Sequence, residues 1–444
     1  MTIALRFDSV AAGGDAVGRA EDGRVVFVPL AAPGDEAVVE LVDQQRRFAR
    51  GRLLELTVAS PQRTPPPCCH FGLCGGCQLQ HLDYRWQLAA KRQLVADALA
   101  RIGKLPGVPV AEVIPTPDPW HYRHTSQFAF GVNEGEAVGG FFAAQSLRIV
   151  NVADCAILAA PCQQLFSATR HLVAGGHLSA FEARTGRGAL RWLETRVTRA
   201  GDQAVATLVT SGQAFDRTAV VAALRASLPV LSGVLQRVVS QQGRGQGRAT
   251  TLWGDPFLFE AIGGRRLRGH AQAFAQVNGP LVPSLLEVVA DYAELTGTET
   301  VADLYAGNGF FTVGALAARS RALIAVERSR LACADAQWNF AEHGLTHCRI
   351  EMGAVENVVA AWAADGRTVD VVVLDPPRSG AAKALGALAA LKPRRVVYVS
   401  CDPATLARDL AALAPLGYRV DRVQPLDLFP QTAHVECVAR LTRE

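Results

Sequence analysis

Hydrophobic and polar residues alternate in short runs along the first 57 residues, with Gly, Pro and Asp between the runs. Two Val-rich runs in GRVVFVPLAAPGDEAVVELV flank the turn signal APGD, and FARGRLLELTV supplies a further run. Alternation of period two between turn residues is the pattern of β-strands with one buried face. The spacing predicts a small five-stranded, OB-like β-barrel over residues 1–59.

The pattern changes at SPQRTPPP, where consecutive prolines favour an extended linker and mark the end of the first domain. Between residues 81 and 103 leucines recur at mixed helical spacing and the run ends in Gly103, which predicts a helix. Alternating strands follow to about residue 150, and mixed helices and strands continue to about residue 270. We expect a central α+β domain over residues 60–270.

Beyond the central region the order is strand, glycine turn, helix, strand. The stretch TVADLYAGNGFFTVGALAARSRALIAVE holds an apolar run, the loop AGNG, a helix from about Phe310 and a second apolar run ending at Glu327. Continuous apolar runs at 369–377 and 394–403 predict two more buried strands. These elements predict a doubly wound, Rossmann-like α/β domain over residues 271–444, so the chain is a multidomain α/β protein.

The length of 444 residues exceeds what one compact core holds, which agrees with two or three domains. No run of about 18 apolar residues passes without a charge or a turn signal, and the N-terminus lacks a basic segment followed by an apolar one. We therefore expect a cytoplasmic protein with neither a membrane span nor a signal peptide. In that reducing compartment the ten cysteines favour metal binding or catalysis over disulfides.

The net charge of +4 is modest, and only four of the 45 basic residues are lysine. Arginine suits bidentate phosphate contacts, but a GC-rich genome produces the same bias. In the barrel region seven Arg stand against nine Asp and Glu, so charge does not favour RNA there. Residues 237–270 hold six Arg against one Asp and one Glu, together with several Gly. This arginine-rich stretch fits a loop that contacts an RNA backbone, and it fits a solvated surface loop equally well.

The loop Gly307-Asn308-Gly309 lies between a predicted strand and a predicted helix, where a ligand can approach the backbone. Glu327 stands at the end of the next strand, in the position that holds two ribose hydroxyls. The loop has no third glycine at the dinucleotide spacing, and S-adenosylmethionine has no pyrophosphate to bind. The loop therefore fits S-adenosylmethionine better than a dinucleotide.

Three further polar residues fall at the ends of predicted strands. Asp375 in LDPPRSG ends a buried strand, and the two prolines favour a rigid turn that projects the carboxylate into the crevice. Cys401 in YVSCDP closes the next strand at the same edge, and Glu436 in AHVECV enters the terminal strand. Alone, Cys401 also fits a small buried residue and Glu436 a paired or solvated one. Together, a thiol, a base, a carboxylate and a methyl donor suffice to methylate C5 of uracil, which a thiolate activates by adding to C6.

Four of the ten cysteines lie within PPPCCHFGLCGGCQLQ, residues 65–80. Cys68, Cys74 and Cys77 have the spacing C-x5-C-x2-C. Thiolates in such a set bind either tetrahedral zinc or an iron-sulfur cluster, and the spacing alone does not choose between the two.

Taken together, SCDPATLARDL, FPQTAHVE, DLYAGNGFF and FAQVN resemble the motifs of the RNA uridine-C5 methyltransferases, S-adenosylmethionine enzymes of bacteria. The resemblance covers essentially the whole chain, and the N-terminal barrel resembles the TRAM domain of that family. It implies that Cys401 is the nucleophile, that Glu436 is the base and that Asp375 is the acid of the D-P-P/A-R motif. It also implies that Gln276 touches both donor and uracil and that Phe274 shapes the pocket.

For the methyl donor, the resemblance implies contacts from Tyr305, Gly307 and Phe310 in the loop, and a contact from Glu327 to the ribose. In the ribosomal-RNA branch of the family, three cysteines of the spacing described above and a distant fourth hold a [4Fe-4S] cluster. The implied ligands here are Cys68, Cys74, Cys77 and Cys155, the last in VADCAIL, which leaves Cys69 as a bystander.

The leading hypothesis is a 23S ribosomal RNA uracil-C5 methyltransferase, with RNA as its partner and no obligate protein partner. A tRNA T-loop uracil-C5 methyltransferase is the alternative within the family, whose tRNA enzymes usually lack the barrel and the cluster. Outside the enzyme class, the alternative is a catalytically inactive iron-sulfur RNA-binding factor. The intact Cys401, Glu436, Asp375 and Gln276 argue against that last hypothesis.

Overall fold

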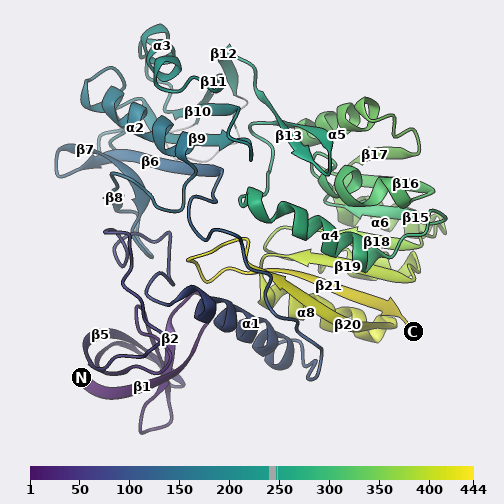
Figure 1. The fold of residues 1–444 in the computed structure, drawn as a ribbon, viewed down its shortest axis with the longest axis horizontal. Coiled ribbons are helices and arrows are strands. Elements are labelled where there is room, and N and C mark those ends of the chain that lie inside the picture. Colours follow the sequence, from purple (N-terminus) through teal and green to yellow (C-terminus); the bar gives the residue numbers. More distant parts are fainter. Residues whose placement is uncertain (240–246, 248) are drawn as a thin grey trace.

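The computed structural model describes residues 1–239, 247 and 249–444 (Figure 1). Residues 240–246 and 248, which belong to the arginine-rich stretch, lie outside the described residues. Three larger sheets organise the fold: a barrel at the N-terminus, a sheet in the middle of the chain and a sheet in its C-terminal part. No helix within the described ranges is long and apolar enough to cross a membrane.

The first strands close into the predicted five-stranded barrel, in the order β1-β2-β3-β5-β4. Inward-facing residues such as Phe7, Val26, Val28 and Val39 form its core. The alternation seen in the sequence is this alternation between core and solvent, because neighbouring side chains of a strand point to opposite faces. The strands are Thr2–Val10 (β1), Ala16–Arg19 (β2), Val25–Val28 (β3), Glu36–Gln44 (β4) and Phe48–Val58 (β5).

A buried carboxylate, Asp35, fastens the following linker to the barrel. It accepts hydrogen bonds from the backbone N–H groups of Ala32 (2.6 Å) and Ser60 (2.8 Å) and from Nη2 of Arg63 (2.7 Å). Burial acts to raise the pKa of Asp35, but the Arg63 guanidinium and the backbone donors outweigh it and hold that pKa below its ordinary value. The linker therefore leaves the barrel in a fixed direction.

The middle of the chain forms a seven-stranded sheet in the order β12-β11-β10-β9-β6-β7-β8. Two helices, α2 and α3, share one hydrophobic core with its strands, in which the rings of Phe128 and Phe166 stack 4.0 Å apart. The strands are Thr125–Asn133 (β6), Glu136–Phe142 (β7), Ile149–Asn151 (β8), Leu190–Val197 (β9), Ala204–Thr210 (β10), Leu231–Val238 (β11) and Thr250–Gly254 (β12). The helices are Ala160–Ala174 (α2) and Arg217–Ser227 (α3).

The C-terminal sheet has the order β17-β16-β15-β18-β19-β21-β20, with β15 to β19 parallel and β21 antiparallel to both of its neighbours. Its central strands are buried on both faces by helices, which is why they are continuously apolar in the sequence. The strands are Thr300–Leu304 (β15), Ala322–Glu327 (β16), Cys348–Met352 (β17), Val371–Leu374 (β18), Arg395–Ser400 (β19), Tyr418–Leu426 (β20) and Glu436–Arg443 (β21). The helices and 3-10 turns are Gly279–Leu281 (η1), Val282–Ala293 (α4), Arg330–Glu342 (α5), Val355–Ala364 (α6), Leu385–Ala390 (α7), Pro403–Leu413 (α8) and Ala414–Leu416 (η4).

Two elements from the predicted central region pack on the C-terminal sheet. The helix predicted over residues 81–103 forms as Tyr84–Arg101 (α1), and its Val95 and Leu99 share a core with Leu410 of α8. A two-stranded hairpin likewise contributes Leu267 to the core of the C-terminal sheet. Its strands are Phe257–Ile262 (β13) and Arg265–His270 (β14). The domain limits at 59 and 270 stay a prediction, and α1 and the hairpin join the parts on either side of them.

The helix predicted from about Phe310 begins there, but it is not a regular α-helix. The chain forms a π-helical turn, Thr312–Leu316 (η2), followed by a 3-10 turn, Ala317–Arg319 (η3). In this turn Gly314 packs so closely on α4 that an added Cβ would lie 2.9 Å from Cδ2 of Leu286. The close approach depends on a partner far away in the sequence, which helical periodicity does not reveal.

Candidate active site

A crevice opens where the order of the C-terminal sheet reverses. Strand β15 pairs with β16 on one side and with β18 on the other, all in parallel, and open α/β sheets bind ligands beyond the strand ends at such a point. A cavity lies there, together with the exposed Phe274. Its lining includes six residues that the sequence predicts to be functional: Phe274, Gln276, Tyr305, Gly307, Phe310 and Asp375. The fold thus gathers them from three separate segments.

The glycine loop leaves open backbone at this cavity. Tyr305 and Gly307 both have left-handed backbone conformations, with φ of 62° and 56°. An added Cβ at Gly307 would meet no atom within 4 Å, so a ligand can approach the backbone there. Glu327 lies behind the loop and accepts hydrogen bonds from the backbone N–H groups of Gly307 (3.1 Å) and Ser329 (2.6 Å). An open glycine turn backed by an acid fits the adenosyl part of a methyl donor.

The strand ladder brings Cys401 and Glu436 together. The last pair between β19 and β21 joins Ser400 to Cys437, so the next residues in line, Cys401 and Glu436, face each other just beyond it. Glu436 is also paired with Leu426 of β20 and is only 3% exposed. The half-buried thiol and the buried carboxyl therefore lie at the same sheet edge as Asp375.

Charges at this edge act strongly on one another. Burial raises the pKa of the Cys401 thiol to about 11, and the Glu436 and Asp375 carboxyls add to that rise. Burial also raises the pKa of Glu436 well above its ordinary value, with a further contribution from Asp375. The pKa of Asp375 is itself raised by burial and by the nearby Asp303. Because its pKa is raised, the carboxylate form of Glu436 is a stronger base than an exposed carboxylate.

One group at this edge, Arg378, was not singled out from the sequence. Its guanidinium hydrogen-bonds to the Cys401 thiol and opposes the rise of the thiol pKa. Its Nη2 also donates to Nε2 of His434 (3.4 Å). A sequence signal was available, because Arg378 follows the rigid Asp-Pro-Pro turn that fixes Asp375.

The four predicted cluster cysteines also come together. Electrostatic interaction with the other three thiols adds to the effect of burial, which raises the pKa of Cys155 to about 12. Burial raises the pKa of Cys77 to about 11, with contributions from Cys74 and Cys68. Gly76 donates its backbone N–H to Sγ of Cys74 (3.4 Å). In the part of the chain that the structure describes, however, no group of three or more His, Cys, Asp or Glu side chains has the arrangement of a metal site.

The arginine-rich stretch is less uniform than its composition suggests. Arg237 pairs with Glu194, and Nε of Arg268 lies 2.9 Å from Oδ1 of Asp335. Arg266 is exposed, and its guanidinium lies 3.7 Å from the ring centre of Phe259. Among the described arginines of this stretch, Arg237 and Arg268 therefore form ion pairs with carboxylates of the protein.

Comparisons with known proteins agree along the chain. The family described as "tRNA (Uracil-5-)-methyltransferase" matches residues 260–444, and the TRAM domain matches residues 2–54. A Bacillus cereus protein named "Uncharacterized RNA methyltransferase" is 35% identical over 94% of this chain and 92% of its own. A similarly named Gloeobacter violaceus protein is 37% identical over 100% of this chain and 96% of its own. The crystal structure of Pyrococcus abyssi tRNA (uracil-54, C5)-methyltransferase in complex with S-adenosyl-L-homocysteine covers 100% of both chains, with 25% identity and a TM-score of 0.78.

The fold and these likenesses define an RNA methyltransferase. More narrowly, the chain belongs to the RNA (uracil-5-)-methyltransferase family and carries an N-terminal TRAM domain. The family, the enzyme class and the TRAM barrel predicted from the sequence are thereby confirmed.

Proposed function

We propose that the protein transfers a methyl group from S-adenosylmethionine to C5 of a uridine in 23S ribosomal RNA, with Cys401 as nucleophile and Glu436 as base. The observation that carries the proposal is the position of these two residues, opposite each other beyond the last pair of β19 and β21. Asp375 lies at the same edge and also lines the donor cavity, so one carboxyl borders both the thiol and the donor.

In the proposed reaction the Cys401 thiolate adds to C6 of uracil, and the electron pair of the C5–C6 double bond makes C5 nucleophilic. C5 then forms a bond to the donor's methyl carbon as the bond from that carbon to sulfur breaks. Glu436 next removes the proton from C5, the double bond re-forms, and the thiolate leaves from C6. The Arg378 guanidinium supports the thiolate, since it opposes the effect of burial on the pKa of Cys401.

S-adenosylmethionine supplies the methyl group, and the cavity residues Gln276, Tyr305, Gly307 and Phe310 would hold it, with Glu327 at the ribose. Support comes from the open backbone at Gly307 and from the similar Pyrococcus abyssi enzyme, whose structure holds S-adenosyl-L-homocysteine.

A tRNA uridine is the second candidate substrate. The Pyrococcus abyssi relative acts on uracil-54 of tRNA, and its likeness covers this whole chain, barrel region included. The barrel therefore does not discriminate between the two RNAs. Mass spectrometry of rRNA and tRNA from a deletion strain tests the choice: loss of 5-methyluridine from 23S rRNA alone supports the proposal, whereas loss from tRNA alone contradicts it.

We further propose that Cys68, Cys74, Cys77 and Cys155 hold a [4Fe-4S] cluster. The closeness of the four thiols and the N–H donor to Cys74 support it, because clusters are bound by four thiolates that often accept such hydrogen bonds. About four iron atoms per chain in anaerobically purified protein are expected. One tightly bound zinc ion in place of iron would overturn this proposal.

A further inference from the structure

The loop between β20 and β21, residues 427–435, leads directly into Glu436. It begins beside that residue as well, because Asp427 follows Leu426, the cross-strand partner of Glu436. Figure 1 shows this yellow loop leaving the sheet toward α1 and the middle of the molecule. The course of the loop therefore bears on where the Glu436 carboxyl lies.

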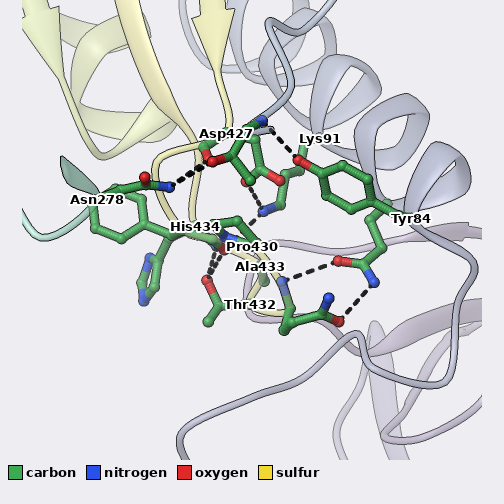
Figure 2. A network of polar contacts seen from close by, with 12 residues as sticks. Tyr84, Lys91, Asn278, Asp427, Pro430, Thr432, Ala433 and His434 are labelled. Carbon is green, nitrogen blue, oxygen red and sulfur yellow. Dashed lines mark hydrogen bonds and ion pairs between the residues drawn. The ribbon is translucent and has the colours of Figure 1, made fainter. Parts of the chain in front are cut away.

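A fully buried ion pair holds the start of this loop (Figure 2). Nζ of Lys91, on α1, lies 2.5 Å from Oδ1 of Asp427, and neither side chain is exposed. Nζ also donates to the carbonyl oxygen of Phe429 (2.9 Å). One ammonium group thus fixes both a side chain and the backbone of the loop.

The next turn of the loop is held by the same part of the chain. The side chains of Gln87 and Gln431 are joined by a hydrogen bond of 2.9 Å, and the Gln431 backbone N–H donates back to Oε1 of Gln87 (3.1 Å). The Tyr122 hydroxyl donates to the carbonyl oxygen of Pro430 (2.9 Å). Helix α1, together with Tyr122, therefore holds three consecutive residues of the loop, Phe429, Pro430 and Gln431.

The network also reaches the donor cavity. Nδ2 of Asn278 lies 3.4 Å from the carbonyl oxygen of Asp427, and Asn278 stands two residues after Gln276 of the cavity lining (Figure 2). Lys91 and Asp427 themselves are not part of that lining. Lys91 therefore contacts the loop without bordering the donor cavity.

A buried ion pair is a weak source of net stability, because removing two charges from water costs about as much as their attraction returns. Breaking it leaves one buried charge unpaired, so the pair strongly favours one arrangement of the groups that it joins. Here those groups are α1 and Asp427, the residue that follows Leu426, the strand partner of Glu436. The pair is therefore suited to fix geometry.

We propose that Lys91 and Asp427 are positioning residues for the base: they hold loop 427–435 so that Glu436 reaches the C5 proton. The inference rests on the proposed function, since it needs Glu436 to remove that proton. The proposed role affects only one of two stages of the reaction, the release of product and not the formation of the adduct. Addition by Cys401 and methyl transfer do not depend on Glu436, whereas release of the methylated uridine does.

The test uses Lys91→Met in the full-length protein with unmodified uridine RNA under single-turnover conditions. The variant should bind donor with wild-type affinity and form the covalent protein–RNA species at the wild-type rate. Release of 5-methyluridine should slow by about tenfold or more, so the denaturation-resistant species accumulates. The matched control is Lys104→Met, in which an exposed lysine is also replaced by methionine, and it should behave as wild type.

Asp427→Asn is the second variant, because it keeps the size of the side chain and an oxygen for Lys91 to donate to. It should show the same slowing of release to a smaller degree, and it carries the test alone if Lys91→Met does not fold. Equal loss of adduct formation and release in both variants, or wild-type release in both, would overturn the positioning role. A wild-type protein that forms neither adduct nor product overturns the proposed function itself.

Discussion

The ionisation of the Cys401 thiol can be shifted by a single change, Arg378→Gln. Burial raises the pKa of this thiol to about 11, with contributions from the Glu436 and Asp375 carboxyls, and the Arg378 guanidinium opposes that rise. Replacing the guanidinium by a neutral amide removes one charge and a charge-assisted hydrogen bond. The pKa of the thiol should therefore rise further.

The size of the effect follows from the pKa values. With a pKa of about 11, about one Cys401 thiol in a thousand is ionised at pH 8. Loss of an opposite charge at hydrogen-bonding distance raises a pKa by at least about one unit. The Arg378→Gln variant should then hold about tenfold less thiolate than wild type at any pH below 10.

The assay is alkylation of Cys401 by iodoacetamide between pH 7 and 10, quantified on the peptide that contains it by mass spectrometry. Only the thiolate reacts, so the wild-type rate should rise about tenfold for each pH unit without levelling off, unlike that of a free cysteine peptide of pKa about 8.5. Arg378→Gln should run parallel to it and about tenfold lower. Lys383→Gln removes an exposed positive charge from the same turn region and should match wild type.

A wild-type rate that levels off near pH 8.5 would show that the thiol is not desolvated as the structure has it. An Arg378→Gln rate equal to that of Lys383→Gln would refute the part assigned to the guanidinium.

Three further outcomes are expected. Cys74→Ser should lower soluble yield and the iron content per chain, measured after anaerobic purification, because it would remove one of the four proposed thiolate ligands. Replacing Arg265 and Arg266 together by Ala should weaken RNA binding and reduce the slope of log affinity against log salt by up to about 2, with donor affinity unchanged in calorimetry. Arg63→Met should lower the free energy of unfolding by about 2 kcal/mol in urea titrations, because Asp35 loses its buried partner. Since the pKa of Asp35 is depressed in the folded state, this difference should be complete above about pH 4 and disappear as the pH falls below it.

The sequence was sufficient for features that depend on neighbours along the chain. Continuous apolar runs predicted buried parallel strands, and Val371–Leu374 forms one. Because parallel strands end at one edge, residues directly after them were expected to meet, and Tyr305 and Asp375 line the same cavity. The alternating runs of the first 57 residues likewise predicted the closed barrel.

Features that depend on distant partners were not predictable in this way. Lys91 and Asp427 are 336 positions apart, and a lysine on a helix is ordinarily solvent-exposed, so nothing local marks the pair. The irregular form of the helix after Phe310 has the same origin, because Gly314 packs against Leu286 of α4. Arg378 could have been singled out from the sequence, because it belongs to the turn that fixes Asp375. Its interaction with Cys401 could not, because Cys401 follows a different strand.

In the proposed reaction Cys401 attacks uracil and Glu436 removes the C5 proton. The most direct test is mass spectrometry of the Glu436→Gln variant after incubation with RNA and S-adenosylmethionine, followed by nuclease and protease digestion. We expect a peptide whose Cys401 carries a uridine nucleotide with one added methyl group, because addition and methyl transfer proceed but the C5 proton stays. Free 5-methyluridine at the wild-type rate, with Cys401 unmodified throughout, would contradict it.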